Sequence, residues 1–220
     1  MGTALKKSRW LLCVSYLLVI TAGCASPVYK ADPKLMIRTN QITRPGLFFS
    51  DVKIYEVSAG GVVELRDDWC TTGKENLQRA LVDGLMRKKY NVKPVFVDEE
   101  LEGEIKEMRA LYASVNRSIQ LHIYGPQFFP EKASNSDYSI GCLEGIVQKL
   151  GVDSLVLVCA FGQVTSVSRR VSISLALADS SGSILWYQMK GSDGGYDLRD
   201  SESTKEFLDG ILVSFPEVGG

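Results

Sequence analysis

The chain has few side chains that could carry out acid–base or nucleophilic chemistry. His122 is its only histidine, and a general base needs an acid or a nucleophile held within hydrogen-bonding reach. Its immediate neighbours, Leu121 and Ile123, supply neither. We therefore interpret His122 as a surface or loop residue. A single histidine also argues against a metal centre built on imidazole ligands.

Carboxylates are the other candidates for catalysis. Glu99, Glu104 and Asp137 could form the acid and base of a hydrolase or transferase, because two carboxyl groups can divide those roles. The sequence contains no glycine-flanked serine elbow, no His-Glu-x-x-His zinc motif and no phosphate-binding loop. We therefore expect no enzymatic activity, and a lipid-anchored periplasmic hydrolase that uses carboxylates remains the alternative.

The composition narrows the classes of ligand. The 220 residues include 25 Lys and Arg against 26 Asp and Glu, a formal charge of −1. Nucleic-acid binding needs a strongly basic face, so the sequence favours no nucleic-acid partner. Asp193, Asp197 and Asp200 lack the alternating spacing of a calcium-binding EF-hand loop. We expect neither a metal nor an organic cofactor.

Residues 1–23 have the layout of an export segment. Lys6, Lys7 and Arg9 precede an apolar run from Trp10 to Ile20, and this order is typical of a secretory signal peptide. The run is shorter than the roughly 20 apolar residues of a transmembrane helix. Removal of the segment leaves 22 basic against 26 acidic side chains, a formal charge of −4.

Two small residues stand directly before a cysteine, as Ala22-Gly23-Cys24, and this resembles the lipobox of bacterial lipoproteins. The resemblance implies cleavage between Gly23 and Cys24, diacylglyceryl transfer to the Cys24 thiol and acylation of the new amino terminus. By resemblance to enterobacterial sorting, the absence of Asp from Ala25-Ser26 favours the outer membrane, with the protein facing the periplasm. A soluble protein cleaved by ordinary signal peptidase and an uncleaved anchor are the alternatives.

The cysteines that remain are Cys70, Cys142 and Cys159, in a compartment that permits disulfides. Three is an odd number, so at least one thiol stays free. Cys159 lies within an apolar run and is interpreted as a small core residue. The sequence leaves open whether Cys70 and Cys142 form a disulfide.

The chain divides into a signal peptide over 1–23, a lipidated cysteine with a tether over 24–46, and a single globular domain over 47–217. Residues 25–46 contain three prolines and show no sustained periodicity, which favours a tether. The apolar run Leu35-Met36-Ile37 leaves open that part of the segment packs on the domain.

Hydrophobic periodicity predicts the elements of the domain. Strands are expected near 48–57, 62–65, 92–97, 154–161, 171–178 and 184–189, with Pro94 placing its strand at an edge. The first helix should follow a capping box at Thr72, the second should span 98–117, the third 138–150, and the last should be capped near Ser203. Arg109 and Arg117 follow an acidic amino end in the second helix, as the helix dipole favours.

The predicted fold class is α+β. We expect a mixed sheet with a C-terminal antiparallel three-strand meander and helices packed on it, in the order β-α-β-α-loop-α-β-β-β-α. Asp179-Ser180-Ser181-Gly182 predicts the turn of one hairpin.

Three runs carry a resemblance to small envelope proteins: Gly151–Val158, Leu175–Asp179 and Gly182–Trp186. They resemble the amino-terminal domain of the Tol system's periplasmic propeller protein. They are also similar to lipoprotein activators of peptidoglycan synthases and to the curli-secretion lipoprotein. The resemblance implies the same general fold and membership of an envelope assembly, and it carries over no catalytic residue.

The candidate partner contacts lie in a loop expected over 118–137 and in a hairpin. Tyr124, Phe128 and Phe129 belong to the loop, and exposed aromatic patches tend to be contact sites. The alternative is that these rings complete the core. Arg169 and Arg170, expected at the tip of the hairpin over 161–171, could meet anionic headgroups or an acidic partner.

The leading hypothesis is a non-enzymatic outer-membrane lipoprotein. It would be anchored through Cys24 and act as an accessory or binding module for an envelope machine in export, transport or cell-wall synthesis. Its partner would be another envelope protein, bound by strand addition at a sheet edge or by the aromatic loop. A ring-forming secretion lipoprotein is the further alternative.

Overall fold

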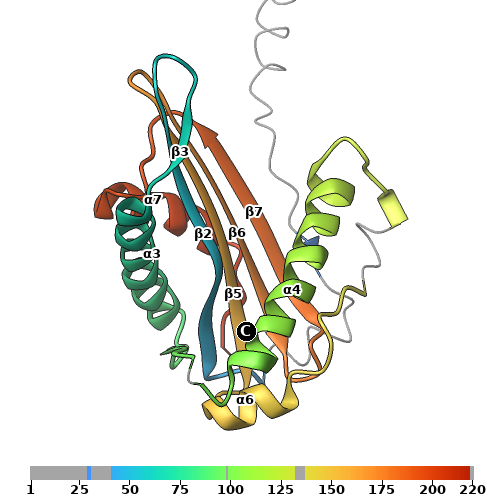
Figure 1. Ribbon diagram of the computed structural model, residues 1–220. Helices are drawn as coiled ribbons and strands as arrows, with labels where there is room; N and C mark the ends of the chain where they lie inside the picture. The colour runs from blue at the N-terminus through green and yellow to red at the C-terminus, as the bar shows by residue number, and fades with distance from the viewer. Residues whose placement is uncertain (1–28, 31–40, 98, 132–136, 219–220) are drawn as a thin grey trace, which may run out of the picture.

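The computed structural model describes residues 29–30, 41–97, 99–131 and 137–218 (Figure 1). The signal segment, including the cleavage residues Gly23 and Cys24, lies outside the described residues. Among the described residues, no helix has the length and apolar character needed to cross a membrane.

A mixed sheet of seven strands, counted over the described residues, forms the centre of the domain (Figure 1). Its order is β1-β7-β6-β5-β2-β3, and β4 also pairs with β2. The meander β5-β6-β7 is antiparallel, whereas β2 runs parallel to β5. The α+β class and the C-terminal meander are therefore confirmed. The strands are β1 (Tyr29–Lys30), β2 (Pro45–Val57), β3 (Val63–Leu65), β4 (Lys93–Pro94), β5 (Ser154–Val164), β6 (Arg169–Asp179) and β7 (Ile184–Asp193).

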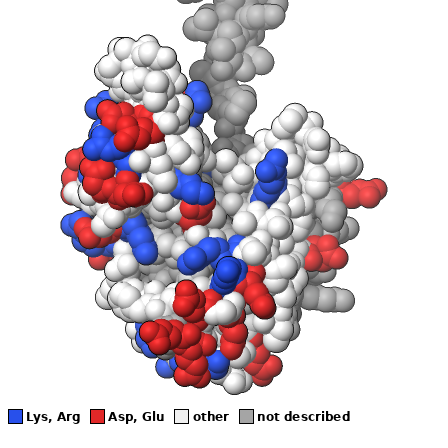
Figure 2. Space-filling view, viewed as in Figure 1, with Lys and Arg blue, Asp and Glu red and all other residues white. Residues whose placement is uncertain are grey.

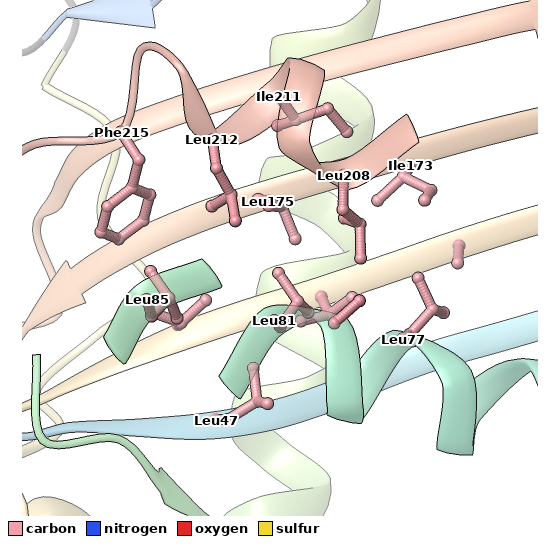
Figure 3. Close-up of a cluster of buried hydrophobic side chains, with 14 of the residues drawn as sticks. Leu47, Leu77, Leu81, Leu85, Ile173, Leu175, Leu208, Ile211, Leu212 and Phe215 are labelled. Atoms are coloured by element: carbon pink, nitrogen blue, oxygen red, sulfur yellow. The ribbon is translucent and has the colours of Figure 1, made fainter. Parts of the chain in front are cut away.

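Two helices cover one face of the sheet. They are α3 (Asp67–Arg87) and α7 (Ser201–Leu212), side by side in Figure 1. Leu77, Leu81 and Leu85 recur at helical spacing on α3 and are fully buried against the sheet. Figure 3 shows these side chains between α3, α7 and the strands, beside Leu208, Ile211 and Leu212.

The opposite face carries α4 (Glu102–Ile119), the π-helical turn η1 (Gln120–Tyr124) and α6 (Glu144–Leu150). Side chains of β5 alternate between the two faces. Leu155 and Leu157 join the core under α4, and Val156 and Val158 join the core under α3 and α7. The continuous burial that the apolar run at 154–161 predicts is therefore confirmed for 154–158, whereas Cys159 is only partly buried and Phe161 is 39% exposed.

The first helix begins earlier than the capping box predicted. α3 starts at Asp67, and Arg66 is its N-cap residue. Thr72 lies inside the helix, where its hydroxyl donates to the carbonyl oxygen of Asp68 at 3.0 Å. A threonine can satisfy its hydroxyl within a helix in this way, so the Thr-x-x-Glu pattern did not mark a helix start. The last helix begins at Ser201, with Asp200 accepting from the backbone N–H of Ser203.

The boundaries of the loop predicted over 118–137 were wrong. Residues 118–124 continue the helix through Ile119 and η1 because Ile119 and Ile123 extend its buried stripe. The helix predicted over 138–150 forms only from Glu144 to Leu150. Ile140 instead donates its N–H to Gly182 at 2.9 Å, so the segment before α6 contacts the β6–β7 turn.

The sheet extends into the segment predicted as a tether. β2 begins at Pro45 and Ile42 is buried in the core, while β1 pairs with β7. The edge strand predicted around Pro94 is confirmed as β4, which is shorter than predicted and covers only Lys93–Pro94. The hairpin turn from Asp179 to Gly182 is also confirmed, with the N–H of Gly182 donating to Asp179 at 2.8 Å.

A candidate binding groove between helix α4 and the sheet

The three aromatic residues singled out from the sequence have different environments. Tyr124 is partly buried, with its ring centroid 5.8 Å from that of Tyr187 and its hydroxyl accepting from the N–H of Met189 at 3.3 Å. Phe128 and Phe129 are about half exposed, and Phe129 packs edge-on against His122. Tyr124 therefore belongs to the edge of the core, and only the two phenylalanines present an exposed apolar surface.

Arg169 and Arg170 lie at the start of β6, not at the tip of the hairpin, because residues 165–168 form the turn. Arg169 pairs with Asp197 at 2.9 Å, and Arg170 forms an ion pair with Asp193. Both arginines are thus neutralised locally. No contact among the described residues joins them to Phe128 or Phe129, so the predicted partner contacts do not form one surface.

The carboxylates considered for catalysis also do not form one cluster. Glu104 forms an ion pair with Lys149 at 2.8 Å, and Glu99 and Asp137 are exposed. No contact within the described ranges joins the three. The same ranges contain no group of three His, Cys, Asp or Glu side chains placed to hold a metal ion. Cys70, Cys142 and Cys159 are free thiols.

A groove of about 970 Å³ lies between α4 and the strands. We call this hollow, with α4 as one wall and the exposed end of the sheet face as the other, the α4 groove. Figure 2, which views the molecule from this side, shows Lys and Arg side chains gathered around the middle of the face. The cations that line the groove are Lys53, Lys106, Arg109 and Arg117, and the one carboxylate is Asp51.

The register of the strands explains the sheet wall of the groove. Asp51, Cys159, Ser174 and Met189 are neighbours across β2, β5, β6 and β7, so their side chains share one face. The row toward the opposite end of the strands, which includes Leu157, is apolar and packs under α4. The sheet face therefore changes from apolar to polar where the groove begins.

The helix wall is a stripe of α4 and η1 that runs beside the buried stripe. Its spacing of three or four residues places the members on one helical face, and the stripe extends for roughly 20 Å at 1.5 Å per residue. Small side chains at its centre leave room for a ligand, and cations stand on both sides of them. The stripe comprises Lys106, Arg109, Ala110, Ala113, Asn116, Arg117 and Gln120.

The cations on the helix wall have no acidic partner among the residues that the structure describes. Lys53, on the sheet wall, pairs with Asp51 at 2.8 Å, and this hydrogen bond raises the pKa of the Lys53 amine. Lys106, Arg109 and Arg117 are exposed and form no ion pair with a described residue. Arg109 lies over the ring of Phe48, with 5.4 Å between its guanidinium carbon and the ring centroid. The groove therefore has an excess of positive charge although the whole chain does not.

The floor of the groove contains a buried polar network. Asn116 and Ser174 are 8% and 2% exposed. The Oδ1 atom of Asn116 accepts from the Tyr187 hydroxyl at 2.6 Å and from the Ser174 hydroxyl at 3.1 Å. Burial raises the pKa of the Tyr187 phenol well above its ordinary value, so this hydroxyl remains a donor.

The α4 groove was not predicted from the sequence. The helix dipole is a sufficient reason for Arg109 and Arg117 to lie late in the helix, so these residues did not indicate a site. A usable signal was present: cations, alanines and amides share a second helical stripe next to the apolar one. Asn116 is a polar residue in the helical stripe that is otherwise apolar and buried, and this position was a further indication of a site.

No family model matches the sequence, and no curated protein matches it. Comparison with solved structures found the LpoB C-terminal domain from Salmonella enterica, with a TM-score of 0.29, 14% identity, and coverage of 72% of this chain and 93% of that chain. It found a PelC dodecamer from Paraburkholderia phytofirmans, with a TM-score of 0.32, 10% identity, and coverage of 76% and 86%.

Lipoprotein GNA1162 from Neisseria meningitidis was also found, with a TM-score of 0.32, 15% identity, and coverage of 77% of this chain and 91% of that chain. TM-scores this low carry no argument about what the present chain binds or does. The comparisons assign the chain to no family, and its function must be argued from its own residues.

Proposed function

We propose that the protein is a non-enzymatic, lipid-anchored binding module of the bacterial outer membrane that holds an acidic segment of a partner envelope protein in the α4 groove. The observation that carries the proposal is the row of cations on the helix wall. Lys106, Arg109 and Arg117 face the groove without acidic partners among the described residues. Cation clusters of this kind favour partners of opposite charge.

The remaining lining favours a peptide over an anionic glycan as the occupant. Leu121, Phe161 and Met189 give the groove apolar contacts between its charges, which match the side chains of a peptide that carries both acidic and apolar residues. Ser172 and Gln120 can pair with backbone amides. The separation of Arg109 from Arg117, roughly 12 Å along the helix, calls for an extended ligand with more than one negative group.

The proposed anchor and location rest on the resemblance of Ala22-Gly23-Cys24 to a lipobox. A lipid on Cys24 holds the domain near the inner face of the outer membrane, where envelope proteins are the partners within reach. We propose no catalytic role, since Glu104 forms an ion pair with Lys149 and no contact among the described residues joins it to Glu99 or Asp137.

The test is the binding of a fluorescein-labelled peptide of alternating Glu and Leu to the full chain in detergent, followed by fluorescence anisotropy. The double variant Lys106→Glu with Arg117→Glu should weaken binding by about tenfold or more, since loss of buried charge contacts costs at least that factor. The control variant Lys74→Glu with Lys205→Glu makes the same charge change on α3 and α7, and it should bind as the unaltered protein does.

Two outcomes would overturn the proposal. In one, the groove variant and the unaltered protein bind the peptide equally. In the other, the protein ignores the peptide and binds polygalacturonate, an anionic glycan, with the same dependence on Lys106 and Arg117. Binding by an equivalent peptide of Gln and Leu at the same strength would also contradict the role of charge.

A further inference from the structure

A nearly buried amide group in the floor of the α4 groove has one end without a partner. Asn116 is 8% exposed yet lines the groove. Its Oδ1 accepts from Tyr187, from Ser174 and, at 3.4 Å, from the Nε2 of Gln120. Its Nδ2 group donates to no described residue.

The orientation of this amide is fixed by its neighbours. The hydroxyls of Tyr187 and Ser174 both donate to Oδ1 of Asn116. Oδ1 is therefore the end of the amide turned toward these two hydroxyls, and Nδ2 is the opposite end. The N–H groups of Asn116 must therefore face the groove.

The residues around the Asn116 amide indicate the charge of the ligand group that would bind there. Arg117, the next residue along the helix, also lines the groove, and Ala113 stands one turn before Asn116 and leaves space above it. Two N–H donors beside a guanidinium match a group that only accepts hydrogen bonds and carries negative charge. A carboxylate has both properties, whereas a backbone carbonyl would leave the arginine unused.

We infer that Asn116 and Arg117 form a pocket for one carboxylate of the bound segment, with Asn116 donating to the carboxylate and Arg117 supplying the charge. This inference rests on the proposed function, because it names the chemistry by which the same groove recognises its partner. It gives the acidic segment a fixed register, since one glutamate or aspartate must sit at this position.

The substitution Asn116→Asp tests the pocket with little change of shape. It keeps an acceptor for Tyr187 and Ser174, removes the donor and adds a negative charge to the groove. The full chain with this change should bind the Glu–Leu peptide about tenfold or more weakly. Gln78→Glu, which adds one negative charge on α3 across the sheet, should bind the peptide as the unaltered protein does.

A second measurement separates recognition from folding. The Asn116→Asp variant should bind the Gln–Leu peptide more tightly than the unaltered protein does, because a side-chain amide can donate to the new carboxylate. A variant that merely folds poorly would bind both peptides more weakly. If the variant lost affinity for both the Glu–Leu and the Gln–Leu peptide, or for neither, the inference that Asn116 and Arg117 bind a carboxylate would be overturned.

The outcomes also distinguish this inference from the proposed function. If Asn116→Asp binds the Glu–Leu peptide normally while Lys106→Glu with Arg117→Glu does not, the groove binds acidic peptides and the pocket at Asn116 is wrong. If the unaltered protein does not bind the Glu–Leu peptide, the proposed function and the pocket both fail.

Discussion

The hydroxyl of Tyr187 on β7 donates to Oδ1 of Asn116 on α4 across 2.6 Å, beneath the floor of the α4 groove. The two residues are 71 positions apart in the chain, and their contact joins the helix wall of the groove to the sheet. Most of the α4–sheet interface is apolar. Because a hydrogen bond depends on the direction between its atoms, this bond helps to specify the position of α4 on the sheet, in addition to the apolar packing.

Removal of this bond should lower stability by a modest amount. Tyr187→Phe deletes the hydroxyl and keeps the buried ring, while Ser174 and Gln120 continue to donate to Asn116. The expected loss in the free energy of unfolding is about 1 kcal/mol, the usual net contribution of one hydrogen bond. Urea unfolding of the full chain in detergent measures it. An unchanged stability would mean that the contact does not hold α4 to the sheet.

The exposed phenylalanines should contribute little to folding. Phe128 and Phe129 are 53% and 52% exposed, so the double variant Phe128→Ala with Phe129→Ala should cost about 1 kcal/mol or less in the free energy of unfolding. Leu157→Ala, at a fully buried position, should cost about 2–5 kcal/mol by comparison. If the double variant lost several kcal/mol, both rings would have to be core residues.

Acid should weaken the loop before α7. Burial disfavours the charged carboxylate of Asp197, yet the hydrogen bonds from Arg199 and Arg169 outweigh it and lower the pKa of Asp197 from 3.8 to about 2. Because the folded pKa lies below the unfolded one, the carboxylate stabilises the fold fully above the unfolded pKa. This stabilisation is lost as the pH falls through about 4 toward 2.

The measurement is the difference in unfolding free energy between the unaltered protein and Asp197→Asn as a function of pH. We expect the difference to be constant from about pH 7 to 5 and to shrink steadily below about pH 4. A difference that grew on acidification, or that did not change with pH, would contradict the role of the two arginines.

The free thiols should react at different rates. Cys142 is exposed, whereas burial raises the pKa of Cys159 to about 11, and the thiolate is the reactive form. A maleimide added near neutral pH should modify Cys142 first, while Cys159, which lines the α4 groove, should react more slowly because little of it is thiolate. Mass analysis of Cys142→Ser and Cys159→Ser variants assigns the sites. Equal rates in the folded protein would contradict the burial of Cys159.

The strands could be predicted because runs of β-branched and apolar residues can be recognised from composition alone. After Ser154 the run to Phe161 is apolar, as a strand covered on both faces requires, and the turn at Gly182 marked the hairpin of β6 and β7. Helix ends were harder to predict, since Thr72 can satisfy its hydroxyl inside a helix as well as at its start. The unwound segment around Ile140 depends on pairing with Gly182, a distant residue that no local pattern reveals.

The α4 groove depends on relationships that span the chain. Lys106 and Arg117 look like ordinary charges on a solvated helix until the sheet beneath them is known to be polar at that level. The polar row that includes Cys159 and Ser174 follows from strand register, which the sequence left undetermined. The buried position of Asn116 could have suggested a site, but the two hydroxyls that donate to it come from β6 and β7.

The central claim is tested most directly in cells, by a photo-crosslinking amino acid at Ala113, an exposed position on the helix wall of the groove. The matched position is Glu75, exposed on α3 across the sheet. We predict a protein adduct from position 113 that disappears when Lys106→Glu and Arg117→Glu are introduced, and no such adduct from position 75. An adduct that survives the charge reversal, or that forms equally from both positions, would contradict the account.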